Sequence, residues 1–155
     1  MIVIPRRLAR APIALYRAGL GGLLGRRFVL LEHRGRRSGR IRQVVLETLR
    51  VEDSTLHLIS GYGWRAQWLR NIEADPRVRV TCGWARPRGG RATILPPAAG
   101  VAVLEEYRRR HPIATRLLAP ALDLPELEAT EPIPEELAQE HPVVRVDLKP
   151  PTRSG

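Results

Sequence analysis

Arg34-Gly35-Arg36-Arg37-Ser38-Gly39-Arg40-Ile41-Arg42 connects two runs, 28–31 and 44–51, that have the composition of β-strands. Five arginines in nine residues repel one another, and nothing in the segment itself can bury them. The glycines let the backbone approach a bound group, the arginines neutralise and grip it, and Ser38 adds a hydroxyl donor. The segment therefore predicts an anion-binding loop, with a solvated basic turn as the alternative.

Composition is that of a globular protein. The 155 residues are 43% hydrophobic and 27% charged, which suits one compact domain with its own core. We therefore expect a single domain over residues 1–155. The lone cysteine, Cys82, excludes an internal disulfide framework, and the four dispersed histidines give no metal-ligand spacing, so no metal is expected.

The amino-terminal stretch carries arginines but does not have the pattern of a signal peptide. Its apolar part is broken by Pro12, Arg17 and several glycines, and no run of about 18 apolar residues occurs anywhere. We expect a cytoplasmic protein with an N-terminal helical extension over residues 1–25. A basic amphipathic helix at 6–24 predicts either peripheral contact with a membrane or a cap on the barrel.

A net charge of +10 raises the question of a nucleic-acid partner. Residues 1–50 hold twelve arginines and two acidic residues, whereas residues 121–155 hold three basic and eight acidic residues. Aromatic residues make up only 5% of the chain, too few for the exposed stacking strands of a nucleic-acid-binding barrel. We expect no nucleic-acid partner.

The remaining patterns predict a small antiparallel barrel. Hydrophobic alternation indicates strands at 28–33, 42–52, 55–60, 77–84, 91–95 and 142–148, and helices at 66–74 and 98–110. A Pro- and Glu-rich segment at 112–141 is expected to be irregular with short helical pieces. The fold class is mainly β (α+β), with six to seven strands and peripheral helices.

Familiar catalytic motifs are missing. The chain has no Walker A loop and no strand-to-helix Gly-x-Gly-x-x-Gly, and Ser38 has no evident His or Asp partner. Cys82 lies in the middle of a strand on an inward face, which favours a structural thiol. What remains is a groove with an arginine-rich end and an aromatic end, which suits a long cofactor with a flat ring and a charged tail.

Three stretches in this order, 31–39, 60–63 and 68–78, closely resemble the deazaflavin-dependent nitroreductase family. These are split β-barrel oxidoreductases that use reduced coenzyme F-420, an 8-hydroxy-5-deazaflavin. The resemblance covers about residues 25–112. It implies a split barrel and a cofactor that donates hydride.

The resemblance also implies which residues bind the cofactor. Arg37, Ser38 and Gly39 match the loop that holds its phosphate and acidic tail, with Arg36 and Arg42 close by. A phosphodiester with several glutamates is a polyanion, for which bidentate arginine is suited.

Other matching positions lie along the expected ring site. Val45 and Leu46 match strand positions under the deazaflavin ring, and Ser60 matches a serine near its reactive part. The following loop and helix contribute Gly61, Tyr62, Gly63, Trp68 and Asn71. For Trp68, simple core packing is the alternative.

The implied activity is hydride transfer to an electrophilic small molecule such as a quinone, enone or nitroaromatic. The protein would then stabilise negative charge and deliver a proton. Ser60 and Tyr62 are the candidate catalytic residues, with water as the alternative donor.

Several alternatives stay open. Residues 112–155 contain no Tyr, Trp or Phe, where well-known nitroreductases carry tyrosines that close over the substrate, so the substrate is open. A non-catalytic carrier of deazaflavin or lipid is the alternative function, and FMN or haem the alternative cofactor. A monomer and a homodimer both fit.

Overall fold

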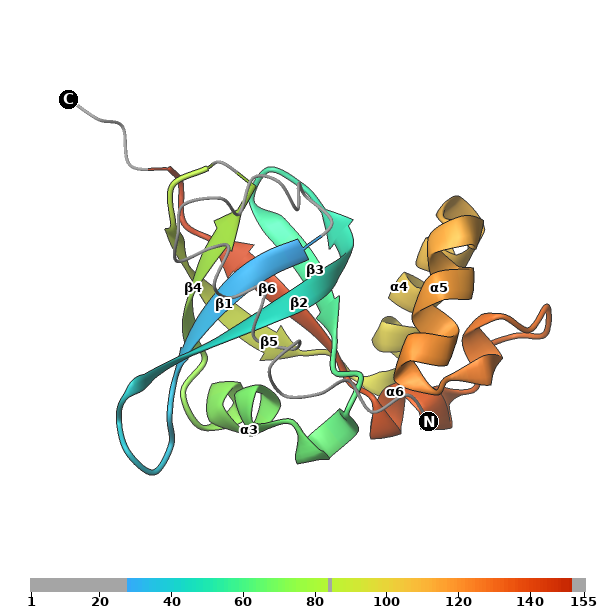
Figure 1. Cartoon of the computed structure of the whole chain (residues 1–155), viewed down its shortest axis with the longest axis horizontal. Helices are drawn as coiled ribbons and strands as arrows, with labels where there is room; N and C mark the ends of the chain where they lie inside the picture. The colour runs from blue at the N-terminus through green and yellow to red at the C-terminus, as the bar shows by residue number, and fades with distance from the viewer. Residues whose placement is uncertain (1–27, 84, 152–155) are drawn as a thin grey trace.

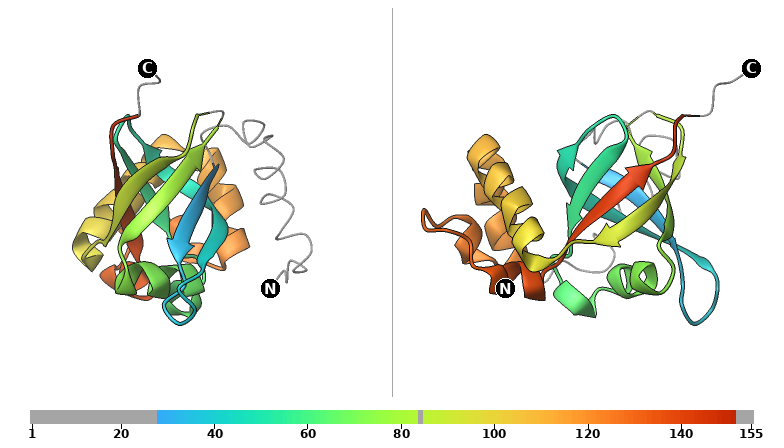
Figure 2. Two further views of the ribbon diagram at one scale, coloured as in Figure 1. Left: turned by 90° about the vertical axis from the view of Figure 1, so that its left-hand side faces the viewer. Right: turned by 180° about the vertical axis from the view of Figure 1, so that it is seen from behind.

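Six antiparallel strands close into a barrel in the order β1-β2-β3-β6-β5-β4 (Figures 1 and 2). The computed structural model describes residues 28–83 and 85–151. The strands are β1 (Phe28–Arg34), β2 (Ile41–Val51), β3 (Thr55–Ile59), β4 (Arg77–Cys82), β5 (Arg88–Ile94) and β6 (Val143–Leu148). The predicted antiparallel barrel is confirmed.

Alternating apolar residues fill the barrel, because successive side chains of a strand point to opposite faces. On β1, Val29 and Leu31 lie in the barrel core and are fully buried. The other strands contribute Leu56, Leu58, Val78, Val80, Ala92, Val144 and Val146 to the same core.

Helix α3 (Gln67–Ala74) packs on this core and follows the short helix η2 (Gly63–Arg65). Trp68, Leu69 and Ile72 are buried among the barrel residues, so Trp68 does pack in the core. Figures 1 and 2 show α3 beneath the barrel, beside the β1–β2 loop. The helix predicted at 66–74 is thus confirmed, and its apolar face closes one end of the barrel.

A second core lies outside the barrel. The helices α4 (Pro97–Arg110), α5 (Pro112–Leu122), η3 (Pro125–Leu127) and α6 (Glu135–Glu140) gather on one side of it (Figures 1 and 2). Leu104 and Leu127 pack there with outward-facing strand residues, namely Leu49, Ile59 and Val143. The outer faces of β3 and β6 are therefore covered where Ile59 and Val143 lie, whereas Asp147 further along β6 stays exposed.

The C-terminal segment is more ordered than its composition predicts. Within residues 112–141, expected to be irregular, α5 is a helix of 11 residues. Arg108 of α4 donates hydrogen bonds to the carbonyls of Ala129 and Glu131 at 2.6 and 2.9 Å, and the Glu105 carboxylate accepts one from the Ile133 amide at 2.8 Å. These long-range contacts tie the connection between η3 and α6 to α4.

Strand β5 begins at Arg88, three residues before its predicted start at 91. Two glycines, Gly89 and Gly90, made this stretch resemble a turn. A Cβ at Gly90 would lie 2.8 Å from the Asp147 carbonyl oxygen, so the close approach of β6 requires glycine there.

Some predictions fall outside the described residues. They are the helix at 6–24 with its membrane contact, the extension over 1–25, and Trp84 at the end of the strand predicted at 77–84. The single-domain organisation and the oligomeric state also stay predictions. Among the helices that the structure describes, none is long and apolar enough to span a membrane.

Gly63 should be intolerant of a side chain. Its φ is +60°, and an added Cβ would lie 2.4 Å from the Glu140 carbonyl oxygen at the end of α6. Gly39 has a similar φ of +70°, with nothing within 4 Å of an added Cβ. We expect Gly63→Ala to lower the free energy of unfolding by about 2–4 kcal/mol and Gly39→Ala by about 1 kcal/mol. Urea unfolding measures both, and equal losses would show that contact with α6 is unimportant.

Candidate functional site

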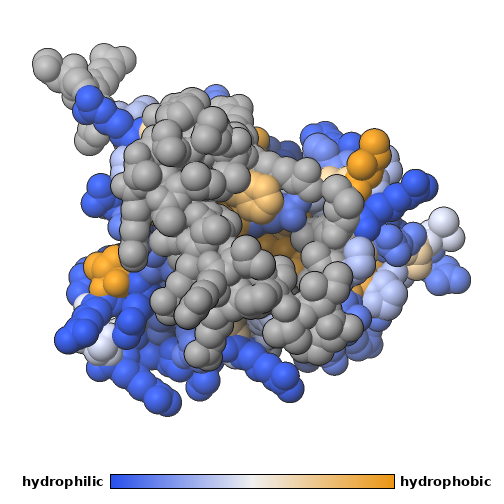
Figure 3. All heavy atoms as spheres, viewed as in Figure 1, coloured by the Kyte–Doolittle hydropathy of each residue, from blue (hydrophilic) through white to orange (hydrophobic). Residues whose placement is uncertain are grey.

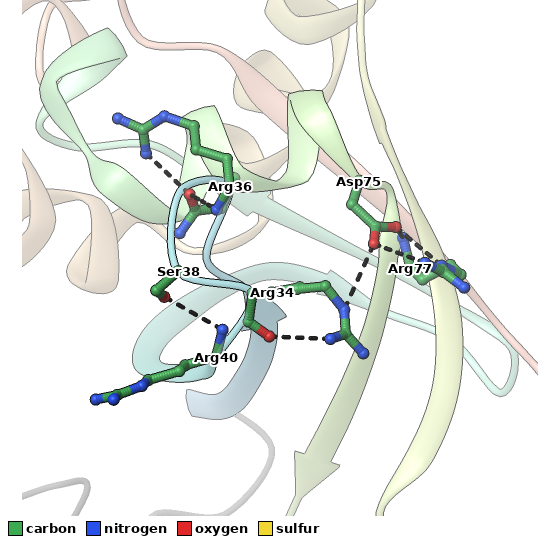
Figure 4. A network of polar contacts seen from close by, with 8 residues as sticks. Arg34, Arg36, Ser38, Arg40, Asp75 and Arg77 are labelled. Atoms are coloured by element: carbon green, nitrogen blue, oxygen red, sulfur yellow. Dashed lines mark hydrogen bonds and ion pairs between the residues drawn. The ribbon is translucent and has the colours of Figure 1, made fainter.

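The arginine-rich segment forms a loop between β1 and β2 that is closed by its own hydrogen bonds (Figure 4). The amide of Gly35 donates to the Arg40 carbonyl at 2.8 Å, and the amide of Gly39 donates to the Gly35 carbonyl at 2.9 Å. The Ser38 hydroxyl oxygen accepts from the Arg40 amide at 3.2 Å. These hydrogen bonds close the loop on itself, while the backbone amide of Arg36 bonds outside it.

One buried amide on α3 fixes this loop. The Asn71 Oδ1 accepts hydrogen bonds from the Arg36 backbone amide at 3.1 Å and from Arg36 Nη1 at 2.8 Å. A second guanidinium nitrogen of Arg36 donates to the Gln67 Oε1 at 3.0 Å, one helical turn away on α3. Arg36 thus ties the loop to the helix, and its charge lies at a fixed position.

The same amide also determines the tautomer and the protonation state of His33. The Asn71 oxygen faces Arg36, so its Nδ2 donates to His33 Nδ1 at 3.0 Å. An amide nitrogen cannot accept, hence Nδ1 of His33 is unprotonated and the ring proton of the neutral imidazole is on Nε2. Burial, and then the charge of Arg42, lower the pKa of His33 to about 4. The two observations agree on a neutral histidine.

Asp75 holds the other side of the loop (Figure 4). Its carboxylate accepts two hydrogen bonds from the Arg77 guanidinium, at 3.0 and 2.9 Å, and lies 3.8 Å from Arg34 Nε. Hydrogen bonds from Arg77, from its side chain first and then its backbone, lower the pKa of Asp75 to about 2. Arg34 also donates to the Gly39 carbonyl at 2.9 Å. Arg34 is therefore occupied in holding the loop.

Three other arginines of this segment, Arg37, Arg40 and Arg42, are exposed and have no side-chain partner within the part of the chain that the structure describes. The pKa of Arg36 is lowered by burial and then by the charges of Arg70 and Arg37, which indicates a local excess of positive charge. Figure 3 shows hydrophilic side chains gathered at the end of the molecule that carries this loop. An anion bound here would find charges without competing partners.

A cavity of about 510 Å³ opens between the loop, β2 and α3. Seven predicted site residues line it: Arg36, Arg37, Ser38, Arg42, Tyr62, Trp68 and Asn71. Six residues that sequence reasoning missed also line it: His33, Gly35, Gln43, Val44, Ala66 and Gln67. We call this space the loop cavity. Its walls combine the exposed guanidinium groups of Arg37 and Arg42 with the apolar side chains of Val44, Ala66 and Trp68.

The other predicted residues lie outside this lining. Gly39 belongs to the loop itself, Leu46 packs against the barrel core, and Val45 is its half-buried neighbour. Gly61 and Gly63 belong to the loop after β3. On β2 the cavity is lined by Arg42, Gln43 and Val44, so ring contacts at Val45 and Leu46 stay predictions.

Ser60 is fully buried, and its hydroxyl donates to the Gly63 carbonyl at 2.7 Å. Its amide donates to the Pro142 carbonyl at 3.0 Å. The side chain therefore stabilises the loop after β3, and this contact does not favour its predicted catalytic role. Tyr62, by contrast, is 74% exposed at the rim of the loop cavity.

Two of the missed residues had a sequence signal. His33 continues the inward-facing alternation of Val29 and Leu31 on β1. Gln67 lies four residues before Asn71, which places both on one face of α3. Each signal places a residue on a face but does not predict its partner, which is Asn71 for His33 and Arg36 for Gln67.

Comparison with known proteins identifies the family of the chain. The family model described as F420H2-dependent quinone reductase matches residues 8–111. The chain belongs to this family. It is therefore an oxidoreductase that depends on coenzyme F-420, as the resemblance implied.

Solved structures support the fold. An F420H2-dependent reductase is 20% identical, with 79% of this chain and 96% of that chain covered and a TM-score of 0.54. An FMN-binding protein related to pyridoxamine 5'-phosphate oxidase, from Nostoc punctiforme, is 20% identical over 96% of this chain and 83% of its own, with a TM-score of 0.56. A haem storage protein from Vibrio cholerae is 13% identical over 88% of this chain and 91% of its own, with a TM-score of 0.52. No curated protein matches.

The neutral state of His33 has a consequence for stability. Because its folded-state pKa of about 4 lies below 6.5, the unfolded chain binds more protons between these pH values. Its contribution, at most about 3 kcal/mol, is present above pH 6.5 and is lost as the pH falls towards 4. We expect His33→Gln, which can still accept from Asn71, to lose this pH dependence.

Urea unfolding at several pH values between about 4 and 7 measures this difference. The pKa of His57 is also lowered, mainly by burial, and this residue is present in both proteins, so its contribution cancels. An identical pH dependence in the two proteins would contradict the assignment to His33.

Proposed function

We propose that the protein transfers a hydride from reduced coenzyme F-420 to a quinone, and that it binds the coenzyme in the loop cavity. The observation that carries this proposal is that Arg37 and Arg42, which have no side-chain partner among the described residues, line one cavity together with Trp68. A flat ring joined to a polyanionic tail needs both surfaces at once. The family description supports the quinone over the enone and nitroaromatic alternatives.

The residues present fit this coenzyme. Arg36, Arg37, Ser38 and Arg42 would hold the phosphate and acidic tail, and Val44, Ala66 and Trp68 offer an apolar wall for the ring. The deazaflavin, when bound, supplies the hydride. The chain's own residues bind and orient it, because Asn71 fixes Arg36 before any ligand arrives.

The alternative that the sequence left open is a non-catalytic carrier of deazaflavin or lipid, and the family description supports the reductase over it. Consumption of menadione with reduced coenzyme F-420 by the full chain distinguishes the two candidates. Tight binding without turnover would support the carrier and contradict the reductase.

Arg37→Ala should weaken binding of the deazaflavin by about 1.5–3 kcal/mol, because it removes a charge-assisted contact to the tail. Isothermal titration calorimetry measures the loss. The same substitution should weaken binding of a tail-less analogue of the coenzyme by less.

Arg109→Ala is the matched control, since it removes the same charge from an exposed position on α4. It should leave the affinity within about twofold. Equal losses for the full coenzyme and the tail-less analogue would show that Arg37 does not hold the tail.

A further inference from the structure

A second open groove lies next to the loop cavity, between η2 and α6. Its volume is about 560 Å³, and its lining is Gly61, Tyr62, Gly63, Trp64, Arg65, Glu140 and His141. Tyr62 lines both spaces, so the two adjoin. In Figures 1 and 2, the β1–β2 loop, α3, η2 and α6 follow one another along one edge of the molecule. A ligand in this groove would lie beside a ligand in the loop cavity.

Two exposed aromatic side chains distinguish this groove. Tyr62 is 74% exposed and Trp64 is 42% exposed, whereas Trp68 and Tyr107 are buried. The indole Nε1 of Trp64 donates to the Gln139 carbonyl at 3.2 Å, which anchors the ring to α6 while much of it stays exposed. An anchored, exposed indole beside an exposed phenol is a surface on which a flat apolar ring can stack.

His141 adds a titratable group to the same groove. Its Nδ1 lies 3.1 Å from the Gly61 carbonyl oxygen and 3.3 Å from the Ser60 carbonyl oxygen. Carbonyl oxygens only accept, so Nδ1 carries a proton and donates to them. The other nitrogen, Nε2, is left to exchange a proton with a ligand or with water. This imidazole therefore has a fixed orientation and a second nitrogen without a hydrogen-bond partner in the part of the chain that the structure describes.

We propose that the groove receives the quinone and that His141 is the catalytic residue that protonates it. The proposal rests on the proposed function above. The quinone accepts a hydride from reduced coenzyme F-420 and a proton from Nε2 of the imidazolium of His141, and leaves as the hydroquinone. The coenzyme is oxidised by two electrons, and the neutral imidazole regains its proton from solvent. Tyr62 and Trp64 hold the quinone ring by stacking.

Quinone binding can be tested without turnover. Menadione is titrated into the full chain, with and without oxidised coenzyme F-420, and its dissociation constant is measured by calorimetry. Trp64→Leu should raise this constant about 2- to 10-fold, the range of a lost aromatic stacking contact. Ile113→Ala is the control, because Ile113 is 75% exposed on α5 and does not line the groove. An unchanged constant in Trp64→Leu overturns the proposed quinone site, including the case in which another part of the chain fills the groove.

Proton donation is tested with His141→Gln and His141→Ala. The glutamine amide can still donate to the Gly61 and Ser60 carbonyls but cannot deliver a proton, whereas alanine removes both functions. We expect His141→Gln to lower kcat for menadione about 10- to 100-fold while the menadione dissociation constant stays within about twofold. Added imidazole should restore part of the rate of His141→Ala. A wild-type kcat in His141→Gln would show a purely structural role and overturn the catalytic assignment.

Menadione turnover by the wild-type chain distinguishes failure of the proposed function from failure of the groove and His141 assignment. If it does not consume menadione with reduced coenzyme F-420, the proposed function itself fails. If it does so, and the variants match it in both binding and kcat, only the groove and His141 are rejected.

Discussion

The side-chain amide of Asn71 is the contact on which the site depends. Its oxygen accepts from the backbone and side chain of Arg36, and its nitrogen donates to His33. A loop with five arginines would otherwise relax away from its own charge. Because the amide is buried and both of its ends are satisfied, breaking either contact leaves an unpaired polar group in the interior. The loop is thereby held in one arrangement, in which Arg37 and Arg42 are exposed.

The barrel and the helical layer each bring one part of the site into place. Helix α3 buries Trp68 and Leu69 against the barrel core and presents Asn71 to the loop, so core packing positions the polar contact. On the other side, α6 meets the loop after β3 at Gly63, and His141 binds the carbonyls of that loop. The C-terminal segment thus reaches the edge where chemistry is proposed, although residues 112–155 contain no Tyr, Trp or Phe.

Much of this arrangement is visible in the sequence, and the reasons for the exceptions are physical. Alternation predicts the strands, and the arginine loop and α3 are predicted close to their observed positions. The hydrogen bond that occupies Ser60 is not predictable, because it depends on the turn geometry at Gly63. The roles of His33 and His141 are also not predictable from the sequence. Their partners lie 38 and 80 residues away in the chain, and no local pattern records such contacts.

A double-mutant cycle on coenzyme binding tests the central claim most directly. The dissociation constant of coenzyme F-420 is measured for the wild type, Asn71→Ala, Arg37→Ala and the double variant. If Asn71 organises the loop that presents Arg37, the Arg37 substitution should cost less in the absence of Asn71, with a coupling energy of about 0.5–2 kcal/mol. Strictly additive losses would contradict the account, because Arg37 would then bind the coenzyme independently of the contact that holds the loop.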